Sequence, residues 1–165
     1  MRFRRMKERM LSDRLPKHRE RVKMPVSELT DGLREFSELY LRAAIILTVD
    51  TMPIGYLDIS DEYAAYAIKL MVKYNVNHRM LRVSLKSDEK YVVIEAEYPD
   101  GLPSLDPMAE IFAAARNAGF ETGFSYNTII LKAPLVEEKL VSFHSGYKRR
   151  FLATLEEMFF DEIYY

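Results

Sequence analysis

Residues 81–97 read LRVSLKSDEKYVVIEAE, and their pattern gives a clear indication of the local structure. Apolar and polar side chains alternate from Leu81 to Leu85, as they do in a strand with one buried face. Residues 86–89 have the composition of a turn, and an apolar, β-branched run returns from Tyr91 to Glu97. The stretch therefore predicts a β-hairpin.

A helix and a second hairpin are expected on the C-terminal side of this hairpin. Residues 98–103 read as a loop, after which Asp106 supplies a helix N-cap with Pro107 at the first helical position. Gly119 stands where a glycine commonly ends a helix. Residues 120–125 and 128–133 predict a hairpin around Tyr126 and Asn127, and Pro134 is expected to stop it.

Further elements are expected on both sides. Residues 28–42 predict an amphipathic helix capped by Ser27, and residues 44–50 predict a strand buried on both faces. Ser60 is the expected N-cap of a second helix that runs to about Asn75. Large apolar residues recur about every four positions from Val136 onward, which predicts a long terminal helix.

The order of elements predicts an α/β fold, more closely an α+β two-layer sandwich. Hairpins contribute most of the strands, so a mixed, mostly antiparallel sheet covered on one face by helices buries the apolar faces best. Three segments are expected: a basic N-terminal arm (1–24), a helix plus sandwich (25–135), and a C-terminal amphipathic helix (136–165).

Charge is distributed unevenly along the chain. Residues 1–23 hold ten Lys or Arg and three acidic groups, a net charge of +7, whereas the remaining residues carry fourteen basic and twenty-two acidic groups, a net charge of −8. Three roles fit the arm: contact with the chain's own body or a neighbouring subunit, nucleic-acid or anionic-surface binding through residues 2–23, and a helix that docks on a partner. The apolar, acidic residues 158–165 are expected to dock on the body or on a second subunit.

Composition excludes several classes of function. The chain has no cysteine, which excludes disulfides, thiolate metal sites and a cysteine nucleophile and agrees with a cytoplasmic protein. Apolar runs such as residues 43–47 are too short to span a bilayer, so no membrane insertion is expected. The histidines His18, His78 and His144 are dispersed, and no metal site or catalytic triad is predicted.

Three segments follow one another in a suggestive order. ILTVD (46–50) precedes GYLD (55–58), AIKLMVKYN (67–75) continues into RVSL (82–85), and ETGFSYNTIILKAPL (121–135) closes the run. In this order they resemble the catalytic and ATP-binding domain of sensor histidine kinases, within the GHKL ATPase superfamily. The resemblance covers a little over half of the chain and implies an α/β sandwich. The middle segment corresponds to the N-box helix of that family.

The sequence departs from the family at the ligand positions. In the family an N-box Asn ligates the Mg²⁺ that bridges the ATP phosphates; Leu70 stands there, and Tyr66 replaces the preceding N-box Asn. Leucine cannot coordinate a hard cation. Of the adenine-reading motif only Asp100 and Gly101 remain, and the glycine-rich lid is missing. Lys73 keeps an N-box position, and with Asp100, Gly101 and Gly123 it outlines a vestigial nucleotide pocket.

These departures favour a non-catalytic protein without cofactor or metal. The preferred hypothesis is a degenerate histidine-kinase-like domain that binds a protein partner, or a second copy of itself, in bacterial signalling. The alternative is an ATP- and magnesium-binding kinase or anti-sigma-factor-like regulator, and a further one is nucleic-acid binding through the arm. His18 lacks the family's phosphoacceptor spacing, although Glu20 and Pro25 follow it.

Overall fold

The computed structural model describes residues 16, 20–76, 79–136 and 147–163. Seven strands form one sheet in the order β1-β3-β7-β5-β4-β2, and β6 pairs with β7 beside this path. β2 and β4 are parallel, whereas the other pairs are antiparallel. The predicted mixed, mostly antiparallel sheet is confirmed. The strands are β1 (Val22–Pro25), β2 (Ile45–Val49), β3 (Tyr56–Ile59), β4 (Leu81–Ser87), β5 (Tyr91–Glu97), β6 (Glu121–Ser125) and β7 (Thr128–Val136).

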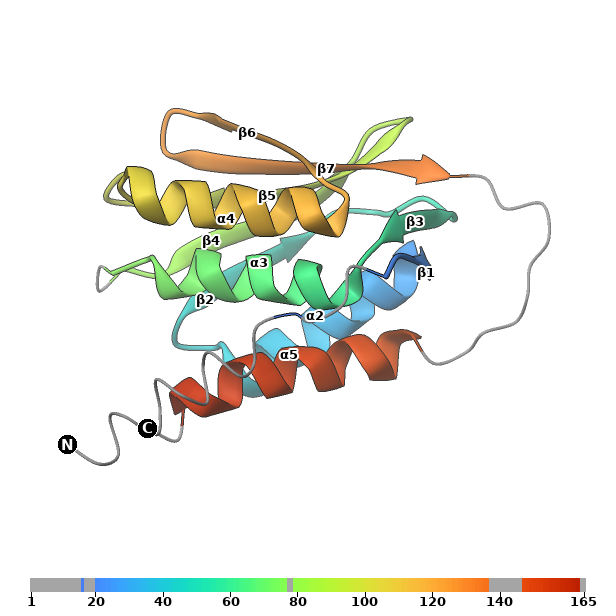
Figure 1. Ribbon diagram of the computed structural model, residues 1–165, viewed down its shortest axis with the longest axis horizontal. Coiled ribbons are helices and arrows are strands. Elements are labelled where there is room, and N and C mark those ends of the chain that lie inside the picture. Colours follow the sequence, from blue (N-terminus) through green and yellow to red (C-terminus); the bar gives the residue numbers. More distant parts are fainter. Residues whose placement is uncertain (1–15, 17–19, 77–78, 137–146, 164–165) are drawn as a thin grey trace.

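Helices cover one face of this sheet (Figure 1). α3 packs beside α4, and α5 packs against α2 and α3 at the side of the molecule far from β6 and β7. α3 therefore lies between neighbours, and six of its apolar or small side chains are buried. The helices are α2 (Val26–Tyr40), α3 (Asp61–Lys73), α4 (Leu105–Ala118) and α5 (Tyr147–Ile163).

The alternation in the first hairpin sets which face is covered. Leu81, Val83 and Leu85 are buried toward the helices, whereas Arg82 and Lys86 are exposed on the other face. β4 pairs with β5 in the register that this pattern requires, with Leu85 opposite Ile94. The hairpin predicted from residues 81–97 is confirmed.

Two predicted helix boundaries are confirmed. Ser60 is the N-cap of α3, and its Oγ accepts a hydrogen bond from the Tyr63 N–H at 3.3 Å. Gly119 ends α4 in the left-handed conformation with φ 109°, which a side chain would strain. Both boundaries depend on local chemistry, which a sequence shows directly.

Two predicted N-caps were wrong. α2 begins at Val26, because the Val26 N–H bonds to the Gly55 carbonyl at 3.0 Å and the chain enters the helix directly from β1. Ser27 therefore lies inside the helix. α4 begins at Leu105 after Ser104, so Asp106 and Pro107 lie in the first turn. Proline is tolerated there, since N–H groups of the first turn have no partner within the helix.

The expected end of the second hairpin was also wrong. β7 continues through Pro134 to Val136 and changes its partner from β5 to β3. The Leu135 N–H bonds to the Lys90 carbonyl at 2.8 Å, and main-chain groups alternate in direction along an antiparallel strand. The nitrogen of Pro134 therefore points away from β5. On that side the missing N–H breaks no hydrogen bond between β7 and β5.

The sequence prediction also misplaced one strand and missed two. β2 was expected to be buried on both faces, but it lies at the edge of the sheet, and Ile46 is 49% exposed. β1 lies in what was expected to be the arm, and β3 was not predicted. The arm residues 1–15, His18, His78, His144 and the segment 137–146 lie outside the described residues.

Candidate functional site

The sequence resemblance predicts a nucleotide site at the contact between α3 and α4. α3 and α4 lie side by side (Figure 1), and alanine side chains are buried on both helices. Leu70 is 2% exposed and belongs to the hydrophobic core. Tyr66 is half-buried and packs against the same core. Both residues that the sequence prediction assigned to the N-box ligand positions thus contribute to packing in this chain.

Tyr98 lies at the start of the loop that contains Asp100 and Gly101, which the sequence resemblance predicts to be part of a nucleotide pocket. Its side chain is 1% exposed, and its hydroxyl donates a hydrogen bond to the Met71 carbonyl of α3 at 2.7 Å. Its own carbonyl accepts from Nδ2 of Asn127 at 3.0 Å, and its N–H bonds to the Asn127 carbonyl at 2.8 Å. The loop is therefore tied to α3 and to the β6–β7 turn immediately before Asp100.

The structure brings together only part of the predicted pocket. The C-terminal end of α3, which is Lys73, and the loop between β5 and α4 lie at the same end of the molecule (Figure 1). The Lys73 ammonium is 5.7 Å from the ring centroid of Tyr74. Asp100 forms an ion pair with Arg79 at 3.6 Å, and Gly101 has φ 104°. Gly123 lies apart from them within β6, opposite Ile130 of β7.

Two buried polar groups on α3 were not singled out from the sequence. Lys69 is 4% exposed, and Asp61 is 0% exposed. Burial raises the pKa of the Asp61 carboxyl, although Arg150 of α5, with Nε 2.8 Å from Oδ2, opposes this shift. Arg150 lies far away in the sequence, so no local pattern could have predicted this pair.

Tyrosines link α3 to α4 near the same end. The Tyr74 hydroxyl donates a hydrogen bond to the Glu110 carboxylate of α4. Burial, together with the negative charge of Glu110 and with Tyr63, raises the pKa of the Tyr66 phenol. Within the described residues, no group of three His, Cys, Asp or Glu side chains could hold a metal ion.

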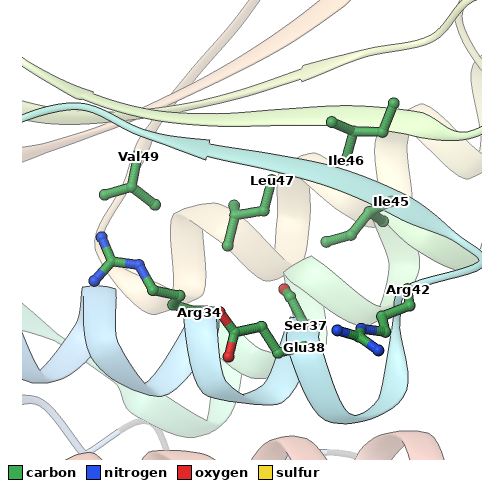
Figure 2. Close-up of a pocket in the computed structure, with 8 residues that line it drawn as sticks. All are labelled: Arg34, Ser37, Glu38, Arg42, Ile45, Ile46, Leu47 and Val49. Carbon is green, nitrogen blue, oxygen red and sulfur yellow. The ribbon is translucent and has the colours of Figure 1, made fainter.

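A groove of about 410 Å³ lies elsewhere, between α2 and the edge strand β2 (Figure 2). The α2 side supplies Arg34, Ser37, Glu38 and, just beyond the helix, Arg42. Figure 2 shows three apolar side chains of β2 pointing toward this polar row, while Ile46 points the other way. They are Ile45, Leu47 and Val49.

The groove is charged along one wall and apolar along the other. Arg34, Glu38 and Arg42 are exposed, and Arg34 forms an ion pair with Asp31 at 3.6 Å. In Figure 2, Arg34 lies below Val49, Glu38 below Leu47 and Arg42 near Ile45. The charged residues beside the three inward side chains of β2 therefore alternate in sign: positive, negative, positive. The sequence prediction missed this groove because it expected residues 44–50 to form a strand buried on both faces.

Comparison with known proteins finds similarity to solved structures. No protein-family model and no curated protein matches the chain. Histidine kinase AdeS of Acinetobacter baumannii is similar, with 13% identity, a TM-score of 0.43, and coverage of 79% of this chain and 75% of that one. The cytoplasmic segment of histidine kinase QseC is also similar, with 14% identity, a TM-score of 0.42, and coverage of 82% of this chain and 87% of that one.

A histidine kinase from Burkholderia phymatum is similar as well, with 14% identity and a TM-score of 0.43 over 79% of this chain and 76% of that one. All three proteins are histidine kinases, the class that the sequence resembles. Within the described residues, no helix combines the length and hydropathy that a membrane span requires.

Proposed function

We propose that this chain is a non-catalytic, histidine-kinase-like domain that binds another protein in bacterial signalling. The observation that carries the proposal is the burial of Leu70, which is 2% exposed in the core at the position of the family's Mg²⁺-ligating Asn. Magnesium takes oxygen ligands in near-ideal octahedral geometry and keeps several waters. An aliphatic side chain embedded in the core can supply neither a ligand nor space for those waters.

The packing around Leu70 supports the same conclusion. Tyr98 fills the core below the Asp100 loop, and its hydrogen bond to Met71 joins this loop to α3. Tyr74 and Glu110 join α3 to α4. A nucleotide would have to separate elements that these contacts hold together. The strand order supports the interaction role, since no strand within the described residues pairs with the outer edge of β2.

Titration with Mg·ATP tests the proposal. A protein that binds ATP gains about 2.7 kcal/mol of stability at a ligand concentration of about 100 times Kd. For a chain of 165 residues, this gain raises the melting temperature by roughly 5–10 °C. We expect no such rise at millimolar Mg·ATP. A reproducible rise would favour the alternative, an ATP-binding regulator with ligands at other positions.

A restored variant provides the matched control. Leu70→Asn returns the family's ligand to its position, and we expect it to destabilise the chain by about 2–5 kcal/mol, because a large apolar group is replaced by a buried amide. It should gain no response to Mg·ATP. If the variant bound nucleotide, the loss of a single side chain would explain the inactivity and the surrounding packing would not.

Nucleic-acid binding through residues 2–23 remains a separate proposal from the sequence. Retention on DNA that falls steeply with salt and disappears when these residues are deleted would support it. The nucleotide titration would be unaffected, so the two results can be separated.

A further inference from the structure

We propose that the groove between α2 and β2 binds an extended segment of a partner protein, which adds to the sheet beside β2 and carries carboxylates four residues apart. The inference rests on the proposed interaction function and names the surface and the chemistry of the partner. Its three grounds are the open edge of β2, the apolar wall of the groove, and the spacing of its charges.

The main chain of β2 offers hydrogen-bonding groups at its outer edge. β2 ends the strand order, and no strand in the part of the chain that the structure describes pairs with its other side. The Leu81 N–H bonds to the Ala44 carbonyl, and the Asp50 N–H bonds to the Leu85 carbonyl, each at 3.0 Å. In a parallel ladder, alternate residues face the partner strand with both main-chain groups.

The register with β4 therefore shows to which side of β2 the main-chain N–H and C=O groups of each residue point. Residues 44, 46, 48 and 50 face β4, and residues 45, 47 and 49 face outward. The Ile45 N–H is occupied, since it bonds to the Leu41 carbonyl at 3.0 Å. Leu47 and Val49 remain with outward N–H and C=O groups, which are the groups that an added strand uses.

The same outward residues direct their side chains into the groove. Ile45 is buried, but Leu47 and Val49 are only half-buried, because the groove beside them is open. An added strand would cover this apolar surface with its own side chains, which stand on the α2 side at every second residue. Strand addition thus provides apolar burial in addition to main-chain hydrogen bonds.

The charges along α2 indicate which charged residues the bound segment should carry. Ile45 and Val49 are four residues apart, which is about 13 Å along a strand. Arg42 and Arg34 lie near these two residues, and Glu38 lies between them (Figure 2). The complementary strand carries carboxylates at positions i and i+4 and a basic residue at i+2, all on the α2 side.

The ion pair of Arg34 with Asp31 does not prevent Arg34 from binding a carboxylate of the partner. Both side chains are about half exposed, 49% and 51%, and such surface pairs contribute roughly 0–1 kcal/mol. A carboxylate of the partner can therefore replace Asp31 at little cost. The net negative charge of the rest of the chain acts weakly, because charges more than about 8–10 Å apart are screened at physiological salt.

The test uses the full chain and a blocked peptide of about nine residues, within the usual length of a strand. Glutamate stands at its third and seventh positions, lysine at its fifth, and valine or threonine elsewhere. We expect the peptide to shift the NMR amide signals of Leu47 and Val49 more than those of Ile46 and Thr48. A control peptide with one glutamate moved by one position places that charge on the opposite face and should bind about tenfold more weakly.

Charge reversal in the groove provides the second measurement. Arg34→Glu combined with Arg42→Glu should weaken binding on the order of tenfold or more, and a peptide with every charge inverted should then bind the double variant better than the wild-type chain. Arg82→Glu is the matched control, because Arg82 is also exposed but lies on the uncovered face of the sheet. It should change the affinity less than twofold.

Several outcomes would overturn the inference. They are the absence of amide shifts at β2, equal effects of the groove and control variants, and a dimer in light scattering that the double variant abolishes. The last would make a second copy of this chain the occupant. Failure of the proposed function is a different result, since Mg·ATP could stabilise the chain whether or not the peptide binds to β2.

Discussion

Among single residues, Tyr98 connects the core to the loop that contains Asp100. Its aromatic ring is buried, and its hydroxyl finds the Met71 carbonyl as acceptor, which is how a buried tyrosine avoids an unsatisfied polar group. Burial also raises the pKa of the phenol, so it stays protonated and remains a donor.

Removing this hydroxyl should destabilise the fold. Tyr98→Phe leaves the ring in place and leaves the Met71 carbonyl without its partner, so we expect the free energy of unfolding to fall by about 1–3 kcal/mol. Urea denaturation followed by circular dichroism measures the change. Tyr126→Phe is the control, because Tyr126 is 95% exposed and should show no effect. Equal stability of the two variants would mean that the hydrogen bond adds nothing.

Asp61 predicts a pH dependence whose sign can be stated. Its pKa is raised in the folded chain above 3.8, chiefly by burial, so between these two pKa values the folded state binds more protons than the unfolded state. The contribution of Asp61 to stability therefore decreases as the pH rises from 3.8 through the folded pKa. Asp61→Asn removes this group, and the stability of the wild-type chain relative to the variant should decrease over the same pH range.

Denaturant titrations of both chains at a series of acidic pH values measure this difference. The opposite slope would show that the ion pair with Arg150, at 2.8 Å, outweighs burial and lowers the pKa instead. Glu62→Gln in the same first turn of α3 is a matched control, because it removes a neighbouring carboxylate that is not fully buried.

The sequence analysis singled out some of these residues and not others. Leu70 and Tyr66 were singled out because the resembling family has Asn at the positions assigned to them. Asp61 could be read only as a favourable acidic residue in the first turn of a helix. Its burial depends on α5, which begins more than 80 positions after Asp61. Long-range burial of this kind leaves no local pattern.

At the scale of elements, α2 and α5 pack through a small residue. A Cβ atom at Gly32 would stand 3.0 Å from Cδ2 of Phe151, whose side chain is fully buried. Lys148 and Glu35 add an ion pair at 3.0 Å along the same contact. Gly32 weakens α2 as an isolated helix, but it lets α5 approach closely.

A double-mutant cycle tests this contact. Gly32→Ala gains up to about 1 kcal/mol of helix propensity, but the added methyl overpacks Phe151, which typically costs about 1–3 kcal/mol. We expect a net loss of stability in the wild-type background. In a Phe151→Leu background the obstruction is smaller, and Gly32→Ala should become neutral or stabilising. Additive effects in chemical denaturation would show that the two positions do not interact.

The elements that sequence predicted best are those bounded by local signals. The hairpin 81–97 has clear alternation, and α3 and α4 have a serine cap and a terminal glycine. β1 and β3 are four residues each and pair with one another at one side of the sheet, where short strands carry little periodicity. The edge position of β2 depends on topology, which composition does not encode, and the groove was missed for that reason.

At the scale of the whole molecule, α5 belongs to the fold and is more than a covering segment. It packs on α2 and α3, which would otherwise expose apolar surface, and aromatic contacts join Phe159 to Phe36 and Phe160 to Tyr40 at centroid distances of 5.1 and 5.0 Å. The core is thus continuous from the sheet through α3 to α5.

A chain that ends at residue 136 should therefore lose its cooperative fold. Four α5 side chains are at most 5% exposed, Phe151, Leu155, Met158 and Phe159. Each contributes roughly 1.5–3 kcal/mol by burial, about 6–12 kcal/mol together, which is comparable to the about 5–15 kcal/mol of a whole domain. Thermal unfolding should lose its sharp transition, and a peptide of residues 147–163 added in trans should restore it. Ala153→Ser, at an exposed position of α5, is the control and should leave the melting temperature nearly unchanged. If the shorter chain kept its melting temperature, the sandwich would be stable alone, and α5 would be free to leave α2 when a partner binds.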